Sequence, residues 1–118
     1  MIKKIIKLHD SEEFYTHEKC YITAMFNNED FKSFSVARSR VEPGITTEVH
    51  KLIDTDEVYY ILSGKGEMEV DGELMGVVVA NDLIFIPKNS KQRIKNTAYN
   101  DLLFLCICSP RFDGRNYQ

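Results

Sequence analysis

A histidine and an acidic cluster stand close together near the middle of the chain. His50 is followed by Asp54, Asp56 and Glu57 within eight positions, and Glu57 opens the apolar, tyrosine-rich run EVYYILS. An imidazole and a carboxylate at this spacing have three ordinary uses: as metal ligands, as an acid–base pair, or as polar residues at the end of a strand. The elements that position these side chains decide among the three uses.

Composition excludes several classes of partner. The chain has 118 residues, which suits one domain spanning residues 1–118. Its 18 acidic and 15 basic residues give a net charge of −3, and the basic residues are spread along the chain, so nucleic acid is not an expected partner. No run approaches the roughly 20 apolar residues that cross a bilayer. We expect a cytoplasmic protein without a membrane partner.

The three cysteines indicate free thiols. Cys20, Cys106 and Cys108 are an odd set with no metal-clip or redox spacing. Cys106 and Cys108 lie two apart in the apolar run LLFLCICS, so on a strand both side chains point to the same face. We interpret all three as small buried hydrophobic residues in a reducing compartment.

Short strands separated by turns account for most of the chain. Apolar or alternating runs cover residues 20–26, 31–41, 57–63, 67–70, 73–80, 83–87, 91–96 and 102–109. Asp71–Gly72 is a two-residue hairpin signal, and Pro87 ends a strand because it has no amide donor. The segment 9–20 allows one or two helical turns capped by Asp10 or Ser11. This pattern predicts a β-sandwich or small barrel with at most a short N-terminal helix.

Two motifs resemble those of the cupin superfamily. The first commonly reads as a glycine, five residues, His-x-His, three or four residues, a glutamate, six residues and a glycine. Every spacing is kept here, with leucine in place of the second histidine: Gly44, His50, Leu52, Glu57 and Gly64.

The second motif is commonly a glycine, five residues, Pro-x-Gly, two residues, a histidine, three residues and an asparagine. The matching positions are Asn81, Pro87, Asn89, Gln92 and Asn96. Asparagine tolerates the left-handed backbone that glycine supplies in turns, so Asn81 and Asn89 are mild structural replacements. The two motifs span residues 44–96, and the resemblance is to a small single-domain cupin. It implies an all-β cupin jelly roll, a double-stranded β-helix barrel, and a homodimer.

The resemblance also implies a site. The matching positions in cupins point into the barrel, so His50, Glu57 and Gln92 are candidate metal ligands and Leu52 is a candidate pocket residue. Imidazole and carboxylate suit Fe, Mn, Ni or Zn, whereas an amide is a weak neutral donor. The alternative is a vestigial site in which Leu52 makes the lining apolar and Gln92 hydrogen-bonds His50 or Glu57.

Chemistry without a metal is a further alternative. Glu57 beside Leu52 and the tyrosines is expected to be partly desolvated, which favours the neutral acid. Some cupin sugar epimerases combine histidine, carboxylate and tyrosine for proton transfer. Tyr59 shares the strand face of Glu57, so Glu57 and Tyr59 are the candidate catalytic residues. The alternative for Tyr59, and the commoner outcome for such a residue, is core packing with its hydroxyl bonded to a neighbour.

Arg38 and Arg40 form a second constellation. They lie two apart in the run VARSRV and so share one strand face. Facing inward, they are pocket residues able to hold a carboxylate or phosphate; facing outward, they are solvated charges, which is the commoner outcome. His9 and His17 lie outside both motifs and are expected at the surface. The isoleucines of IKKIIKL suit an edge strand that packs across subunits.

Together these features predict a barrel pocket for a small polar molecule. The resemblance implies a metal-dependent enzyme, isomerase-, lyase- or dioxygenase-like, acting on a sugar or small organic acid. The alternative is a non-catalytic small-molecule-binding cupin with a vestigial metal site.

Overall fold

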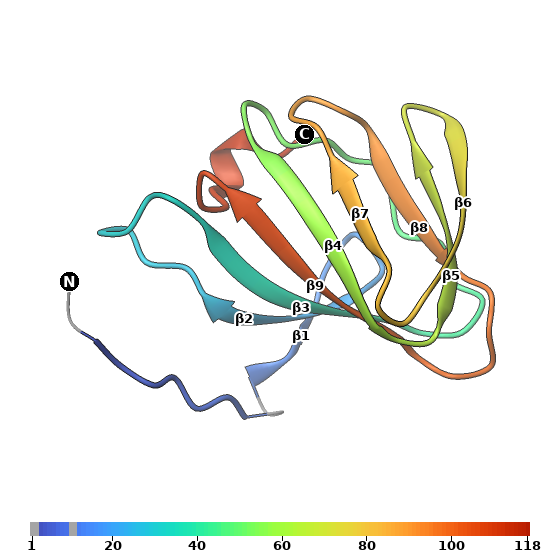
Figure 1. Cartoon of the computed structure of the whole chain (residues 1–118), viewed down its shortest axis with the longest axis horizontal. Coiled ribbons are helices and arrows are strands. Elements are labelled where there is room, and N and C mark those ends of the chain that lie inside the picture. The colour runs from blue at the N-terminus through green and yellow to red at the C-terminus, as the bar shows by residue number, and fades with distance from the viewer. Residues whose placement is uncertain (1–2, 10–11) are drawn as a thin grey trace.

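The computed structural model describes residues 3–9 and 12–118, and its regular structure there is antiparallel strands with one short 3-10 helix, Gly114–Asn116. The strands are β1 (Phe14–Tyr15), β2 (Tyr21–Phe26), β3 (Ser35–Val41), β4 (Asp56–Ser63), β5 (Lys65–Val70), β6 (Glu73–Val79), β7 (Leu83–Ile86), β8 (Gln92–Asn96) and β9 (Leu102–Ser109). One sheet has the order β1-β2-β3-β9-β4-β7 and the other the order β6-β5-β8. Figure 1 shows the second sheet, on the right, beside the first. The predicted all-β jelly roll is confirmed.

The short N-terminal helix that the sequence allows is not formed as an α-helix where the structure describes the segment. Its expected caps, Asp10 and Ser11, lie outside the described residues. The described residues 12–20 contain no α-helix, and Phe14–Tyr15 forms β1, which pairs with Tyr21–Ile22 of β2. A weak capping signal is overridden because strand pairing with β2 supplies the backbone hydrogen bonds that a helix would have made.

The turns follow the chemistry expected of their residues. Asp71 and Gly72 have φ values of 52° and 78° and join β5 to β6. Both central residues therefore have the positive φ of a type I′ hairpin turn. Asn81 and Asn89 have φ values of 76° and 67°. The interpretation that these asparagines replace motif glycines in left-handed turns is confirmed.

Gly64 shows why the first motif ends in glycine. It has a φ of 94° between β4 and β5, and a Cβ added there would lie 2.8 Å from the carbonyl oxygen of Asp101. Only glycine meets both conditions without displacing the chain. The turn holds the end of β4 in place, and β4 carries the central carboxylate of the site.

The apolar core packs between the two sheets. Its most deeply buried members include Ile61, Met68, Ile94 and Phe104, none more than 2% exposed. On β4 and β9 the cross-strand pairs are Ile61 with Phe104, Tyr59 with Cys106 and Glu57 with Cys108. From Ile61 towards Glu57, the side chains of these pairs therefore change from hydrocarbon to polar groups and thiols.

Asn96, the last residue of the second motif, is a buried structural residue. Its amide nitrogen donates to the carbonyls of Val41 and Asn100, at 2.9 and 2.8 Å, and its side-chain oxygen accepts from the amide of Ala98 at 2.9 Å. These contacts join β8 to the end of β3 and to the turn before β9. No helix in the described part of the chain is long and apolar enough to cross a membrane.

Candidate functional site

A cavity of about 670 Å³ opens between the N-terminal segment, the first sheet and the C-terminal segment. This volume suits a small-molecule ligand. Its lining is mostly apolar, with polar groups that include Glu18, His50, Glu57 and Tyr117. The predicted residues Leu52 and Tyr59 also line the cavity.

The His50 ring is held on one nitrogen and stacked on one face. Its Nδ1 lies 3.0 Å from the carbonyl oxygen of Glu48, and a carboxylate oxygen of Glu18 lies 3.3 Å from the same nitrogen. Tyr117 stacks on the ring with centroids 5.2 Å apart and planes 15° apart. Because a carbonyl only accepts, Nδ1 donates and the neutral ring keeps its lone pair on Nε2.

Glu57 is a buried carboxyl group with one unpartnered oxygen. It is 6% exposed, and the thiol of Cys108 donates to its Oε2 at 3.4 Å. Its Oε1 is buried and no group meets hydrogen-bond geometry with it, although the Gln92 amide is close enough to favour the carboxylate. Burial raises the pKa of Glu57 above its usual 4.5, against the opposing effects of the Gln92 amide and of His50. The site therefore favours the neutral acid, which can donate a proton or a hydrogen bond.

Tyr59 and Gln92 bond each other. The Tyr59 hydroxyl donates to Oε1 of the Gln92 side chain, and both residues are buried. The Tyr59 ring packs against Phe104 with centroids 4.5 Å apart, and burial raises the pKa of the hydroxyl well above 10. Tyr59 therefore packs in the core with its hydroxyl bonded to a neighbour, which was the alternative to a role in proton transfer. Its ring still borders the cavity.

The C-terminal segment closes one wall of the cavity. Tyr117 forms an isolated bridge with Leu52, and the backbones of Lys51 and Gln118 exchange two hydrogen bonds of 2.8 and 3.0 Å. His50 and Gln92 exchange another pair, of 3.2 and 2.8 Å. The strand-like segment carrying His50 and Leu52 is therefore held between β8 and the chain end, which sets the His50 ring against Tyr117.

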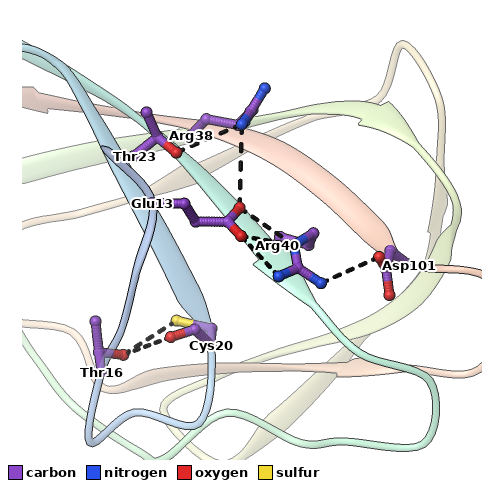
Figure 2. A network of polar contacts seen from close by, with 7 residues as sticks. All are labelled: Glu13, Thr16, Cys20, Thr23, Arg38, Arg40 and Asp101. Atoms are coloured by element: carbon purple, nitrogen blue, oxygen red, sulfur yellow. Dashed lines mark hydrogen bonds and ion pairs between the residues drawn. The ribbon is translucent and has the colours of Figure 1, made fainter. Parts of the chain in front are cut away.

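Arg38 and Arg40 do not line the cavity, which is the outward alternative for this pair. Ser35, Ala37 and Ser39 line the cavity, and alternation along β3 places both arginines on the opposite face. In Figure 2 both arginines reach towards Glu13. Arg40 makes a forked contact to that carboxylate and also bonds Asp101 at 3.2 Å, while Arg38 donates to Thr23.

A family model, the cupin domain, matches residues 37–108, which is more than half of the chain. The chain belongs to the cupin family. An uncharacterized protein from Methanocaldococcus jannaschii is 36% identical over 84 residues, covering 71% of this chain and 66% of that protein. The oxalate-binding protein of Thermotoga maritima is 34% identical over 71 residues, covering 60% of this chain and 58% of that protein. This cupin thus spans less than two thirds of each relative.

Solved structures agree on the fold. Pac13 from Streptomyces, described as a nucleoside dehydratase, superposes with a TM-score of 0.80 at 19% identity, covering 99% of this cupin and 90% of Pac13. At this identity the likeness concerns the fold alone.

The residues of this cupin do not fit a tightly held metal. Among residues 3–9 and 12–118 no group of three or more His, Cys, Asp or Glu side chains is arranged to hold an ion. Leu52 replaces one imidazole with hydrocarbon, and the Gln92 oxygen, the predicted third ligand, already accepts from Tyr59. His50 and Glu57 remain, and two ligands are fewer than the three that catalytic zinc sites use. We derive no chemistry through a metal.

Several lining residues were not predicted as part of the site. Glu18 and Tyr117 come from segments outside both motifs, and no pattern in the sequence links them to His50. Cys20, Cys106 and Cys108 are free, as expected, but all three line the cavity. The shared face of Cys106 and Cys108 was visible in their spacing. His9 and His17 are exposed as expected, although His17 also reaches the cavity rim, where its Nε2 lies 3.1 Å from the Tyr117 hydroxyl.

Proposed function

We propose that this cupin binds a small molecule in the barrel cavity and moves a proton on it, with His50 as the base and Glu57 as the acid. The chemistry is isomerase- or lyase-like and uses no resident metal. The observation that carries the proposal is the unpartnered, buried Oε1 of Glu57 in the same cavity as an imidazole whose other nitrogen is already engaged.

The two groups suit opposite halves of one proton transfer. The lone pair on Nε2 of His50 accepts a proton from the ligand, and the resulting positive charge lies beside the Glu18 carboxylate, 3.3 Å from Nδ1. The neutral carboxyl of Glu57 gives its proton to an oxygen of the ligand, which neutralises the negative charge that develops there. One acid and one base kept in different protonation states are what a proton-transfer site needs.

The comparisons support the small-molecule part of this proposal. Pac13, with a very similar fold, is described as a nucleoside dehydratase and has been solved with uridine. Its described activity, loss of water, is one that an acid and a base perform together. We therefore carry nucleosides and sugars forward as the first compounds to test.

The test begins with a thermal-shift screen of sugars, nucleosides and small acids, because a ligand that prefers the native state raises its melting temperature. Compounds that bind are then incubated with the protein in D₂O and followed by NMR. We expect deuterium incorporation or loss of water with wild type, and a rate at least about 100-fold lower with His50→Gln or Glu57→Gln. Bound compounds that stay chemically unchanged would refute the catalytic proposal.

A non-catalytic binding cupin is the second candidate. It is favoured by the Tyr59–Gln92 hydrogen bond, which engages the hydroxyl proton and one lone pair of the amide oxygen, and by the apolar Leu52 wall. The D₂O experiment separates the two candidates, since a binding module gives thermal stabilisation without isotope exchange.

The single domain over residues 1–118 and the cytoplasmic location stay predictions. We also propose that the protein is a homodimer. Side chains on β6 and β7 are unusually exposed for their type, among them Val77 at 57% and Phe85 at 58%. Such apolar patches commonly mark association surfaces. Light scattering after size-exclusion chromatography should give twice the chain mass, and Phe85→Lys should shift it towards the monomer. A monomeric wild type would end this proposal.

A further inference from the structure

The described part of the cavity wall has no permanently charged cation. Among the described residues that line it, none is lysine or arginine. Two basic residues that neighbour lining residues in the sequence are engaged elsewhere: Arg40 bonds Glu13 and Asp101 on the outer face of β3, as Figure 2 shows, and the Lys19 ammonium lies 2.9 Å from the Glu48 carboxylate. A carboxylate or phosphate entering the cavity therefore meets no fixed cation.

The acidic groups that line the cavity supply no positive charge. Glu18 contributes a carboxylate, and Glu57 contributes a carboxyl group whose pKa is raised by burial. If the His50 ring is protonated, its charge is met by Glu18, whose carboxylate lies 3.3 Å from Nδ1. His17 stands at the exposed rim and contacts the Tyr117 hydroxyl. In a partly desolvated cavity, an uncompensated negative charge on a ligand is costly.

Most other polar atoms on the wall are already used. The Thr47 hydroxyl bonds the backbone of Ile94, the Ser35 hydroxyl accepts from the amide of Phe112, and the Thr16 hydroxyl donates to the carbonyl of Cys20. Oε1 of Glu57 is unpartnered, and the lone pair of the His50 ring lies on the nitrogen opposite the engaged one. A ligand thus finds a largely apolar wall with few polar partners.

We propose that the ligand of this cavity carries no negative charge: it is an uncharged molecule with an apolar body, whose polar atoms meet His50 and Glu57. This inference rests on the proposed function and narrows its substrate class. The sequence led us to expect a sugar or a small organic acid, and the inference excludes the acids. It also separates this cupin from its Thermotoga relative, which is named for binding oxalate.

The experiment compares matched compounds that differ in charge. Uridine is paired with uridine 5′-monophosphate, and galactose with galacturonate, across a wider panel of alcohols and nucleosides with their carboxylates and phosphates; oxalate is tested alone. Affinities are measured by ligand-observed NMR at fixed ionic strength. We expect the uncharged member to bind at least about tenfold more tightly, which corresponds to about 1.4 kcal/mol, and oxalate not to bind.

Two variants test the cause. Glu18→Gln removes a lining carboxylate and should narrow the affinity ratio within each pair several-fold. Glu73→Gln removes the same formal charge at an exposed position on β6 that does not line the cavity, and it should leave the ratio unchanged. An unchanged ratio in Glu18→Gln would overturn the electrostatic explanation.

The outcomes separate this inference from the proposed function. If anionic members bind as tightly as their neutral partners, or more tightly, the charge selection is refuted while a small-molecule site stands. If no compound of either charge binds across the panel, both proposals fall.

Discussion

Replacing Glu57 by glutamine should change how stability depends on pH. Glutamine keeps the size of the side chain and removes its ionisation. In wild type, burial raises the pKa of Glu57 above 4.5, so the folded protein holds this proton at pH values where the unfolded chain has released it. The stability that the neutral acid contributes is fully present below about pH 4.5 and is lost as the pH rises through the folded-state pKa.

The size of the effect follows from one proton. Within that window the free energy of unfolding of wild type should fall relative to Glu57→Gln by up to about 1.4 kcal/mol per pH unit. Above the window the variant should be the more stable protein. Urea unfolding at a series of pH values, followed by circular dichroism, measures the difference directly, with Glu73→Gln as the control for loss of an exposed carboxylate.

Parallel curves for wild type and Glu57→Gln would refute this reasoning, because they would mean that the carboxyl ionises alike in the folded and unfolded states. If the free energy of unfolding of Glu57→Gln fell relative to wild type as the pH rises, the sign would be reversed. The folded site would then hold the carboxylate rather than the acid.

Three further predictions concern the scaffold and the donor set. Asn96→Ala should lower the free energy of unfolding by about 3 kcal/mol in urea titrations, since it removes three hydrogen bonds of a buried side chain; a loss below about 1 kcal/mol would contradict the structural role. Arg40→Met should cost only about 1 kcal/mol and leave ligand affinity unchanged, because the Arg40–Glu13 pair is partly exposed and lies outside the cavity; weaker ligand binding would contradict that placement. Elemental analysis of protein purified without a tag should find equal, substoichiometric metal in wild type and His50→Ala, whereas one equivalent lost in the variant would restore the metal site.

The fold could be predicted from sequence because its signals are local. Asp71–Gly72 fixes a hairpin by its own conformational preference, and Asn81 and Asn89 supply the left-handed turns of the second motif without a glycine. Period-two geometry also put His50 and Leu52 on one face, and the resemblance to the cupin motifs implied that they point into the barrel together with Glu57. These expectations concern positions within or beside one strand.

The rest of the site depends on contacts between segments far apart in the chain. Glu18 reaches His50 because its carbonyl accepts from the amide of Glu48 at 3.0 Å, and Tyr117 does so through its bridge to Leu52. Neither pairing leaves a pattern in the sequence. For Arg38, alternation shows which β3 residues share its face, but the pairing of β3 with β2 and β9 decides whether that face is the inner one.

The central claim is that His50 offers an unprotonated nitrogen to a ligand in the cavity. Long-range ¹H–¹⁵N correlation spectra measure this directly, because the chain has three histidines and His50→Gln assigns the ring of interest. We predict that the neutral ring carries its proton on Nδ1 and that a bound uncharged ligand shifts the Nε2 resonance. A ring with its proton on Nε2, or one that no bound ligand perturbs, would contradict the account.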